Sequence, residues 1–378
     1  MNWKVPFADV RLGPEEKAAV MAVLDSNWLT MGPMTEAFEA AFAAALGGEP
    51  LRAVAVANGT AALHLALAAL GIGPGDEVIV PSLTFVATAN AARYVGATPV
   101  LVDVTSESDW NLDPEDIARK ITPQTKAVAV VHYGGYPADM GRIMNIARAR
   151  GLAVVEDASH GPLAEWQGRK LGTIGDVGCF SFFSNKNMTT GEGGMVTTAR
   201  PEIAEAVRRM RSHGMTSNTY ARFKGHSFGY DVVGLGYNYR IDEMRAAMGL
   251  VQLGKLPGWN SARRMLVAEY RRRLARRLPE IGVPFADRDG PFAYHIFPVL
   301  LPAGYADRAG LMARLADKGV QTSIHYRPIH WMTGFGGDET LALPVTDALA
   351  PRILTLPLFS TLAPEQIDYV VESLAHCL

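Results

Sequence analysis

The order of apolar and polar positions predicts alternating strands and helices over the first two thirds of the chain. From about residue 50, short apolar runs rich in β-branched residues alternate with longer segments of helical periodicity. The runs predict strands at 53–56, 77–80, 99–104, 127–131 and 152–155, and the longer segments predict helices at 60–70, 87–94 and 140–150. Brief apolar strands separated by helices are typical of a parallel sheet that is buried on both faces. We therefore expect an α/β fold in which a mainly parallel sheet is sandwiched by helices.

The pattern changes after about residue 255. Apolar residues at helical spacing predict a helix at 261–278. Further patterns predict a strand at 293–301, a helix at 309–318, a strand at 322–326 and a last helix at 364–374. A chain of 378 residues is longer than one hydrophobic core commonly serves. We expect a large domain over residues 1–255 and a smaller C-terminal α+β domain over residues 256–378.

Composition and charge exclude several classes of protein. The formal net charge is −2 and the pI is about 6.5, so nothing drives the whole molecule toward nucleic acid or an anionic membrane. The arginines within residues 269–277 fit the solvated face of an amphipathic helix. No stretch approaches the length of a membrane-spanning helix, and two distant cysteines make neither a disulfide framework nor a metal cluster. These features predict an enzyme of the cytoplasm that binds no nucleic acid and enters no membrane.

Three short motifs carry candidate chemistry. Asn58-Gly59-Thr60 lies between a strand and a helix, where backbone N–H groups can bind phosphate. Asp157 follows the strand at 152–155, and the carboxyl ends of strands are where open α/β sheets bind ligands. Lys186 follows an apolar strand and precedes the glycine-rich run 189–194. Each motif alone has a plain structural explanation: a turn, a helix cap or a surface lysine.

Together the three motifs predict a pyridoxal 5'-phosphate (PLP) site. PLP requires a lysine for a Schiff base, an acid that keeps the pyridine nitrogen protonated, and a cradle for the phosphate. Burial suits a lysine for this chemistry, because it lowers the pKa and frees the amine. Lys186, Asp157 and the Gly59-Thr60 turn are candidates for the three parts.

The sequence resembles the DegT/StrS-type sugar aminotransferases, which have the aspartate-aminotransferase fold (fold type I). Besides the three motifs, the resemblance rests on segments that run in order along nearly the whole chain: Trp28-Leu29-Thr30-Met31-Gly32-Pro33, Pro81-Ser82-Leu83-Thr84-Phe85-Val86-Ala87-Thr88, Gly236-Tyr237-Asn238-Tyr239-Arg240 and His325-Tyr326-Arg327-Pro328-Ile329-His330. Two places depart from the family pattern. Asn27 stands where relatives often carry glycine, and residues 224–233 match poorly, so we expect that stretch to influence substrate choice.

The resemblance implies a role for each matching residue. Lys186 would form the Schiff base and then move the proton of the transamination, Asp157 would pair with the pyridine nitrogen, and Phe85 would stack on the ring. The other implied cofactor contacts are His160 near the ring's phenolic oxygen, Gly59, Thr60 and Ser181 on the phosphate, and Asn238 on the phosphate held by the neighbouring subunit. The last contact implies a homodimer with shared active sites. Phe85 and Ser181 could equally be core and strand residues.

The substrate side of the site is less well marked. His325, Tyr326 and His330 are candidates to line the substrate pocket, and Arg240 is a candidate for the phosphates of a nucleotide. Two histidines without a third ligand do not predict a metal site.

The resemblance implies an enzyme that moves an amino group from L-glutamate to a nucleotide-linked keto-deoxysugar. His160 and Glu192 in the glycine run favour the 4-keto position over the 3-keto position. Two alternatives stay open: a 3-keto sugar aminotransferase, and a PLP-binding regulatory protein without turnover. A desulfurase on the same fold would need a reactive cysteine, whereas Cys179 has the pattern of a buried apolar residue.

Overall fold

The computed structural model describes residues 3–217, 229–337 and 341–378. Its centre is a seven-stranded sheet with the strand order β1-β9-β8-β5-β4-β2-β3. The strands are β1 (Arg52–Val56), β2 (Glu77–Pro81), β3 (Thr98–Val102), β4 (Thr125–Val131), β5 (Ala153–Asp157), β8 (Val177–Ser181) and β9 (Gly194–Thr198). β9 runs antiparallel to β1 and β8, and the other pairings are parallel. The prediction of a mainly parallel sheet is confirmed.

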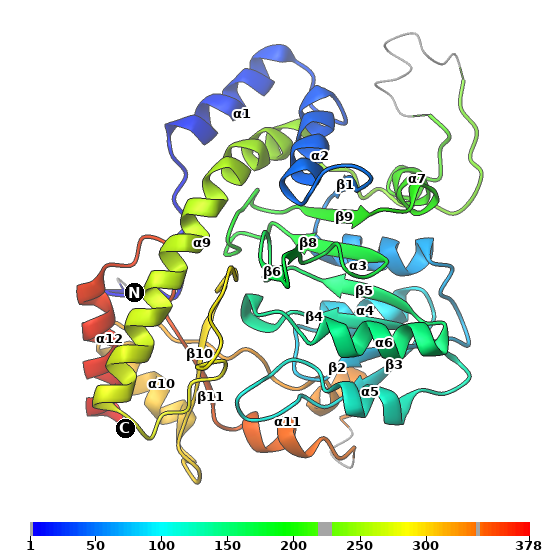
Figure 1. The fold of residues 1–378 in the computed structure, drawn as a ribbon. Helices are drawn as coiled ribbons and strands as arrows, with labels where there is room; N and C mark the ends of the chain where they lie inside the picture. Colours follow the sequence, from blue (N-terminus) through cyan, green and yellow to red (C-terminus); the bar gives the residue numbers. More distant parts are fainter. Residues whose placement is uncertain (1–2, 218–228, 338–340) are drawn as a thin grey trace.

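Helices cover both faces of this sheet, as Figure 1 shows. Successive strand residues point to opposite faces, so Val54 packs with α3 on one face while Ala53 packs with α2 on the other. The elements of this part are α1 (Pro14–Ser26), α2 (Pro33–Ala45), α3 (Gly59–Ala69), α4 (Ala87–Tyr94), α5 (Pro114–Lys120), η1 (Tyr133–Gly135), α6 (Met140–Arg150), the short strands β6 (Glu165–Trp166) and β7 (Arg169–Lys170), and α7 (Pro201–Met210). Burial on both faces explains why the strands carry apolar runs rather than alternating polar residues.

The second part of the chain packs against one end of this sandwich. It contains α9 (Glu243–Arg277), β10 (Phe297–Leu300), α10 (Arg308–Asp317), η2 (Ile329–Trp331), η3 (Thr333–Phe335), α11 (Pro344–Leu349), β11 (Ile353–Leu356) and α12 (Pro364–Cys377). The long helix α9 joins the two parts (Figure 1), so the boundary predicted at residues 255 and 256 falls inside a helix. None of the described helices is both long enough and apolar enough to span a bilayer.

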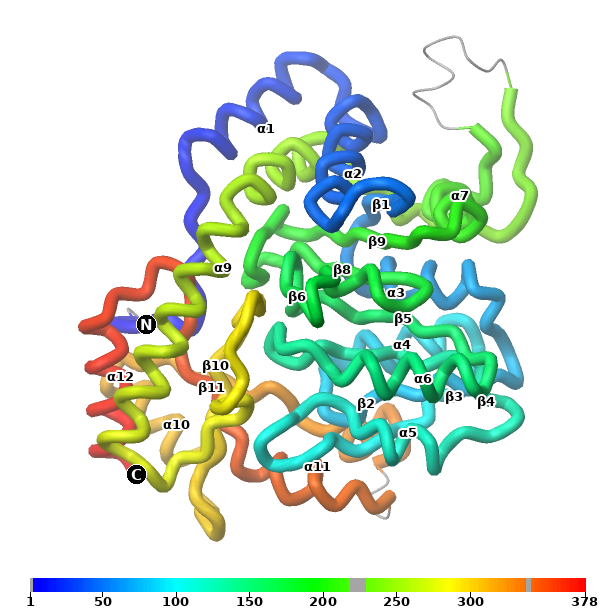
Figure 2. Tube along the Cα trace, viewed as in Figure 1, coloured from blue at the N-terminus to red at the C-terminus, as the bar shows by residue number. Residues whose placement is uncertain are grey.

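Two predictions of local structure need correction. The helix predicted to begin at Ser261 begins at Glu243 and continues through Pro257, because the buried side chains of Leu253 and Leu256 hold the turn where the proline lacks an N–H. The predicted strand at 322–326 is a single bridge between Ser323 and Thr355. The N-terminal segment pairs Val5 with Val320 of the smaller part, and Figure 2 shows both chain ends on that side.

Asn27 takes the shape that a glycine would take. It ends α1 in the left-handed conformation, with φ of 58°. Asparagine is among the residues that best tolerate this region, so the departure from the family pattern leaves the helix end intact. Of the other departing stretch, residues 224–228 lie outside the described residues.

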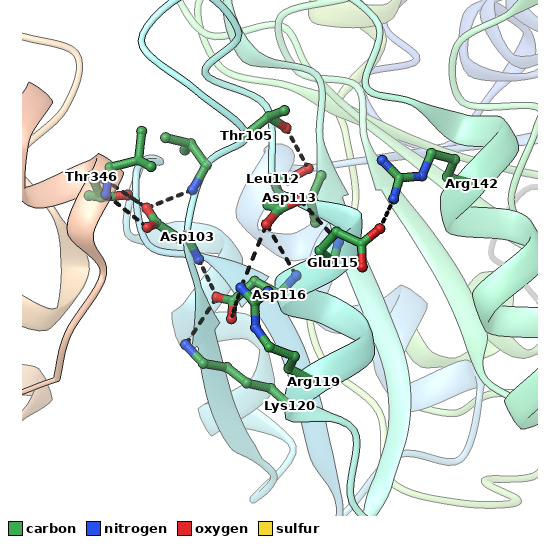
Figure 3. A network of polar contacts seen from close by, with 12 residues as sticks. Asp103, Thr105, Leu112, Asp113, Glu115, Asp116, Arg119, Lys120, Arg142 and Thr346 are labelled. Atoms are coloured by element: carbon green, nitrogen blue, oxygen red, sulfur yellow. Dashed lines mark hydrogen bonds and ion pairs between the residues drawn. The ribbon is translucent and has the colours of Figure 1, made fainter.

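A polar network fastens the smaller part to the sheet next to the site. Asp103, just beyond β3, accepts hydrogen bonds from the backbone N–H groups of Val345 and Thr346 and from the Thr346 hydroxyl. Its own N–H donates to Asp116, which also pairs with Lys120 (Figure 3). α11 is thereby held against the end of β3, which restrains the chain that carries the substrate candidates.

Candidate active site

A cavity of about 410 Å³ lies at the carboxyl ends of the parallel strands. Gly59, Thr60, Phe85, Asp157, His160, Ser181, Lys186, His325 and Tyr326, all expected at the site, line it. Most of them follow strands β1, β2, β5 and β8, which end at one edge of the sheet. The smaller part contributes His325 and Tyr326 and so closes the cavity from the other side. This placement agrees with the general position of ligand sites in open α/β sheets.

The side-chain amine of Lys186 has a lowered pKa. Lys186 lies in the loop after β8, where its backbone N–H donates to the carbonyl of Phe183 at 2.9 Å. Burial lowers the pKa of its side chain to about 8, and the nearby Asp157 carboxylate opposes this shift. With this pKa about a tenth of the amine is neutral at pH 7, far more than for an exposed lysine, so the amine can act as a nucleophile or a base.

Asp157 ends β5 and points into the cavity from a buried position. Its carboxylate accepts a hydrogen bond from the Thr88 hydroxyl at 2.8 Å and one from the N–H of Ser159 at 3.2 Å. These two donors fix the direction of the carboxylate and leave lone pairs for another donor. A protonated ring nitrogen is such a donor.

The N-terminus of α3 provides an anion cradle. The Asn58 side chain caps the helix by accepting the N–H of Ala61 at 2.8 Å. The N–H groups of Gly59 and Thr60 have no partner among the described residues. A Cβ on Gly59 would lie 2.7 Å from the Cβ of Ser181, so only glycine fits between the helix and β8. Two free donors beside a serine hydroxyl suit a phosphate.

His160 and Tyr326 form a connected pair. The Nδ1 of His160 accepts the N–H of Gly134 at 3.3 Å, and burial and Lys186 hold the pKa of this ring well below its usual range. The ring is therefore neutral with its hydrogen on Nε2, which donates to the Tyr326 hydroxyl oxygen at 3.0 Å. The hydrogen of the Tyr326 hydroxyl then remains available to a ligand in the cavity.

Phe85 and His325 complete the cavity walls. The side chain of Phe85 is 58% exposed, which places it outside the core and against the opening. His325 stacks on Phe7 with 5.4 Å between ring centroids, and burial lowers its pKa to about 4. Both residues are uncharged at neutral pH and give the cavity apolar surfaces.

Three predicted site residues lie elsewhere. His330 does not line the cavity: it is buried between the Ser82 hydroxyl at 2.6 Å and the Asp347 carboxylate at 2.9 Å, and thereby ties η2 to β2 and α11. Asn238 is exposed and lies outside this cavity. Arg240 lies beside Arg211 and is also outside it. For His330 the physical reason is the turn of η2, which directs its ring toward the sheet rather than the opening.

Sequence reasoning missed two residues. Thr88 orients Asp157, and a hydroxyl on the second residue of α4 gave no signal of this. His295 lines the cavity next to His160, with 4.4 Å between ring centroids. It lies in the apolar run 293–301, where a single polar residue inside a predicted strand was the available signal.

The described residues offer no support for two other chemistries. Cys179 is fully buried in the core, and burial and nearby acids raise the pKa of its thiol well above the usual range. A thiolate there is disfavoured, unlike the reactive cysteine that a desulfurase needs. Within the described ranges, no group of three or more histidine, cysteine, aspartate or glutamate residues is placed to hold a metal ion.

Comparison with known proteins settles the family. The model of the DegT/DnrJ/EryC1/StrS aminotransferase family matches residues 10–375. The chain belongs to this family. It is therefore a PLP-dependent aminotransferase that acts on a sugar, and its fold is that of the family's PLP-dependent enzymes.

Individual relatives agree along the whole length. Spore coat polysaccharide biosynthesis protein SpsC of Bacillus subtilis is 38% identical over 380 residues, covering 98% of this chain and 96% of SpsC. The crystal structure of S. venezuelae DesV is 38% identical, covers 98% of both chains and has a TM-score of 0.89. The PMP form of Spr1654 from Streptococcus pneumoniae is 28% identical, covers 99% of both chains and has a TM-score of 0.92; Spr1654 has also been solved in a PLP form. The family membership expected from the motifs is thus confirmed.

Proposed function

We propose that this aminotransferase transfers the amino group of L-glutamate to a nucleotide-linked keto-deoxysugar at the 4-keto position, with Lys186 as the residue that binds PLP covalently. The observation that carries the proposal is the meeting of three parts in one cavity: the amine of Lys186, the oriented carboxylate of Asp157 and the free N–H groups at the start of α3. These are the three parts that PLP requires.

The residues present fit PLP by shape and by charge. The gap between Gly59 and Ser181 admits no side-chain atom, which leaves the helix N–H groups open to the phosphate. Asp157 would pair with the ring nitrogen, Phe85 would cover one face of the ring, and His160 would approach its phenolic oxygen. When bound, PLP supplies an electron-accepting ring that carries the amino group between the two substrates.

The chain's own residues then handle protons and orientation. Lys186, with a pKa near 8, removes a proton from the amino-bearing carbon of the donor and returns a proton to the carbon of the sugar that receives nitrogen. Asp157 would keep the ring nitrogen protonated when PLP is bound. Tyr326, whose hydroxyl oxygen already accepts from His160, directs its hydrogen toward the substrate.

The choice of the 4-keto position rests on two residues. His160 stands three residues after Asp157, and Glu192 of the glycine run lines the same cavity. The nucleotide and the donor rest on the family resemblance. Arg240, beside Arg211, offers a positive charge that a nucleotide's phosphates would need.

The proposal also includes a homodimer and a location in the cytoplasm. Asn238 is exposed and does not line its own cavity, which suits a side chain that reaches the phosphate of a neighbouring subunit. We therefore propose a homodimer with shared sites. The free state of Cys179 and Cys377 agrees with a reducing cytoplasm.

A coupled assay tests the substrate. Purified protein with PLP is given L-glutamate and, in parallel, a 4-keto and a 3-keto 6-deoxysugar nucleotide. We expect 2-oxoglutarate and an amino sugar nucleotide in equal amounts from the 4-keto compound, at a rate at least ten times that with the 3-keto compound. Preference for the 3-keto compound would overturn the proposed position. Binding of PLP without formation of an amino sugar from either compound would point to a PLP-binding protein without turnover.

A further inference from the structure

His295 occupies the cavity without a role in the account so far. It precedes β10 on the smaller part of the chain, its side chain is buried, and it lines the cavity beside His160. Its backbone is fixed as well: its N–H donates to the carbonyl of Gly134 at 2.8 Å, and its carbonyl accepts from Arg263 at 3.0 Å. These two bonds fix the position of the His295 backbone beside the cavity.

A chain of amides determines which ring nitrogen of His295 carries the hydrogen. Asn260 donates from Nδ2 to the carbonyl of Pro162 at 3.0 Å, so its Oδ1 is an acceptor. Asn187 donates from its own Nδ2 to that Oδ1 at 2.9 Å and to the carbonyl of Ala293 at 2.6 Å. The Oδ1 of Asn187 is therefore an acceptor too, and the Nδ1 of His295, 2.9 Å away, must donate to it.

The Nε2 of His295 is consequently a bare acceptor. Burial, followed by the nearby charge of Lys186, holds the pKa of the ring well below its usual range, so the ring is neutral and Nε2 keeps its lone pair. This atom has no hydrogen-bond partner among the described residues, although Lys186 lines the same cavity. The cavity thus holds both an acceptor without a donor, the Nε2 of His295, and a donor that can pair with it, the Lys186 amine.

The other two imidazoles of the cavity do not offer the same atom. His160 uses both of its nitrogens, one with Gly134 and the other with Tyr326. The Nδ1 of His325 lies 3.0 Å from the Thr355 hydroxyl, which can donate or accept, so its tautomer is not fixed by the protein. His295 is thus the imidazole whose acceptor is set by its surroundings.

We propose that His295 is a positioning residue for Lys186: rotation of the lysine side chain lets its amine donate a hydrogen bond to the Nε2 of His295 when that amine is not covalently bound to the cofactor. The proposal rests on the role proposed for Lys186. A lysine side chain has many rotamers, and a free amine that strayed would have to be brought back before each proton transfer. A fixed acceptor keeps the amine at one place during both halves of the reaction.

The proposal predicts the sign of a pKa change in the protein without cofactor. The titratable groups that line the cavity with Lys186 are the carboxylates of Asp157 and Glu192, the neutral rings of His160, His295 and His325, and the Tyr326 hydroxyl. An acceptor stabilises the ammonium form, so its loss should lower the pKa of Lys186 further. His295→Phe keeps a ring of similar size and removes the acceptor; we expect a decrease of about one pH unit.

The experiment is an NMR titration of Lys186 in the full-length protein freed of cofactor, with lysine labelled with ¹³C and the signal assigned by its loss in Lys186→Arg. His295→Gln offers an amide oxygen and should restore at least half of the decrease. Asn187→Leu releases the ring and should shift the pKa in the same direction as His295→Phe. His64→Phe replaces another buried histidine, outside the cavity lining, and should leave the titration unchanged.

The outcomes decide the proposal independently of the cofactor. A titration of Lys186 that is the same in His295→Phe as in the wild type, or moved upward, would overturn it. If His295→Phe does not fold, Asn187→Leu and the ¹⁵N signals of His295 in the wild type decide instead: hydrogen on Nδ1 supports the proposal and hydrogen on Nε2 contradicts it. Because no PLP is present, a failure here is separate from a failure of Lys186 to bind PLP.

Discussion

The two walls of the cavity are built differently. The wall on the large part consists of residues at the ends of strands and at the first turn of a helix, such as Asp157, Ser181 and Gly59. The wall on the smaller part consists of irregular chain around His325 and Tyr326, held by contacts to distant residues. Strand and helix geometry sets the directions of side chains on the first wall, whereas only tertiary contacts set them on the second.

His330 and Tyr326 illustrate the difference. They lie four residues apart on the same irregular segment, yet Tyr326 faces the cavity and His330 faces Ser82 and Asp347. On the first wall, Asp157 and Ser181 end neighbouring parallel strands and reach the same edge. We therefore expect substitutions on the first wall to change catalysis, and substitutions of the residues that support the second wall to change mainly the stability of the fold.

The largest expected effect is on the first wall, at Asp157. Asp157→Ala removes the charge that keeps the ring nitrogen protonated, so both half-reactions should slow about 10²- to 10³-fold while the protein still folds. Stopped-flow absorbance with glutamate and with the keto sugar measures the two rates. Asp287→Ala changes an exposed carboxylate and serves as the control. A loss below threefold would show that Asp157 does not serve the ring.

A smaller effect, on the affinity for PLP, is expected at the N-terminus of α3, where the phosphate would bind. In Gly59→Ala the new Cβ would lie 2.7 Å from Ser181 and spread the start of α3 away from β8. We expect PLP to bind about tenfold more weakly, equivalent to about 1.4 kcal/mol. Equilibrium titration of the protein with PLP measures this. Gly73→Ala, where the nearest atom is 3.9 Å from the added Cβ, should bind PLP as the wild type does; equal affinity of the two variants would argue against the cradle.

The rate at which PLP attaches covalently to Lys186 should change by a similar factor with pH. The Lys186 amine reacts with PLP only when neutral, and burial lowers its pKa from the usual 10.5 to about 8. The rate of covalent attachment to the protein freed of cofactor should therefore rise about tenfold from pH 7 to pH 9 and level off above it. A rate that keeps rising toward pH 10.5 would show an ordinary exposed lysine. The stability of the fold should also rise with pH. Burial of the charged amine destabilises the fold fully below about pH 8, and this cost falls away between pH 8 and 10.5.

The smallest effect on catalysis is expected on the second wall, at His330. His330→Ala leaves Ser82 and Asp347 without their partner, so the free energy of unfolding should fall by about 2 kcal/mol. The KM for the sugar substrate should change less than twofold, because the ring does not reach the cavity. Chemical denaturation and steady-state kinetics measure the two quantities. A large rise in KM with unchanged stability would restore His330 to the substrate pocket.

What the sequence could predict follows this division between the walls. Short apolar strands and their polar ends are local patterns, so the parallel sheet, Asp157, Lys186 and the α3 turn were all predictable. The continuation of α9 through Pro257 and the direction of His330 depend on packing partners far away in the sequence. The same holds for His295, whose function arises from Asn187 and Asn260, more than a hundred and about thirty-five residues away.

Chemical trapping tests the central claim, that Lys186 binds PLP covalently, most directly. The protein is incubated with PLP, reduced with borohydride, digested and sequenced by mass spectrometry, in parallel with Lys186→Ala and with Lys126→Ala as an exposed lysine control. The account predicts one phosphopyridoxyl group per chain, on Lys186, in the wild type and in Lys126→Ala, and none in Lys186→Ala. Stoichiometric label on a different lysine, or label that persists in Lys186→Ala, would contradict it.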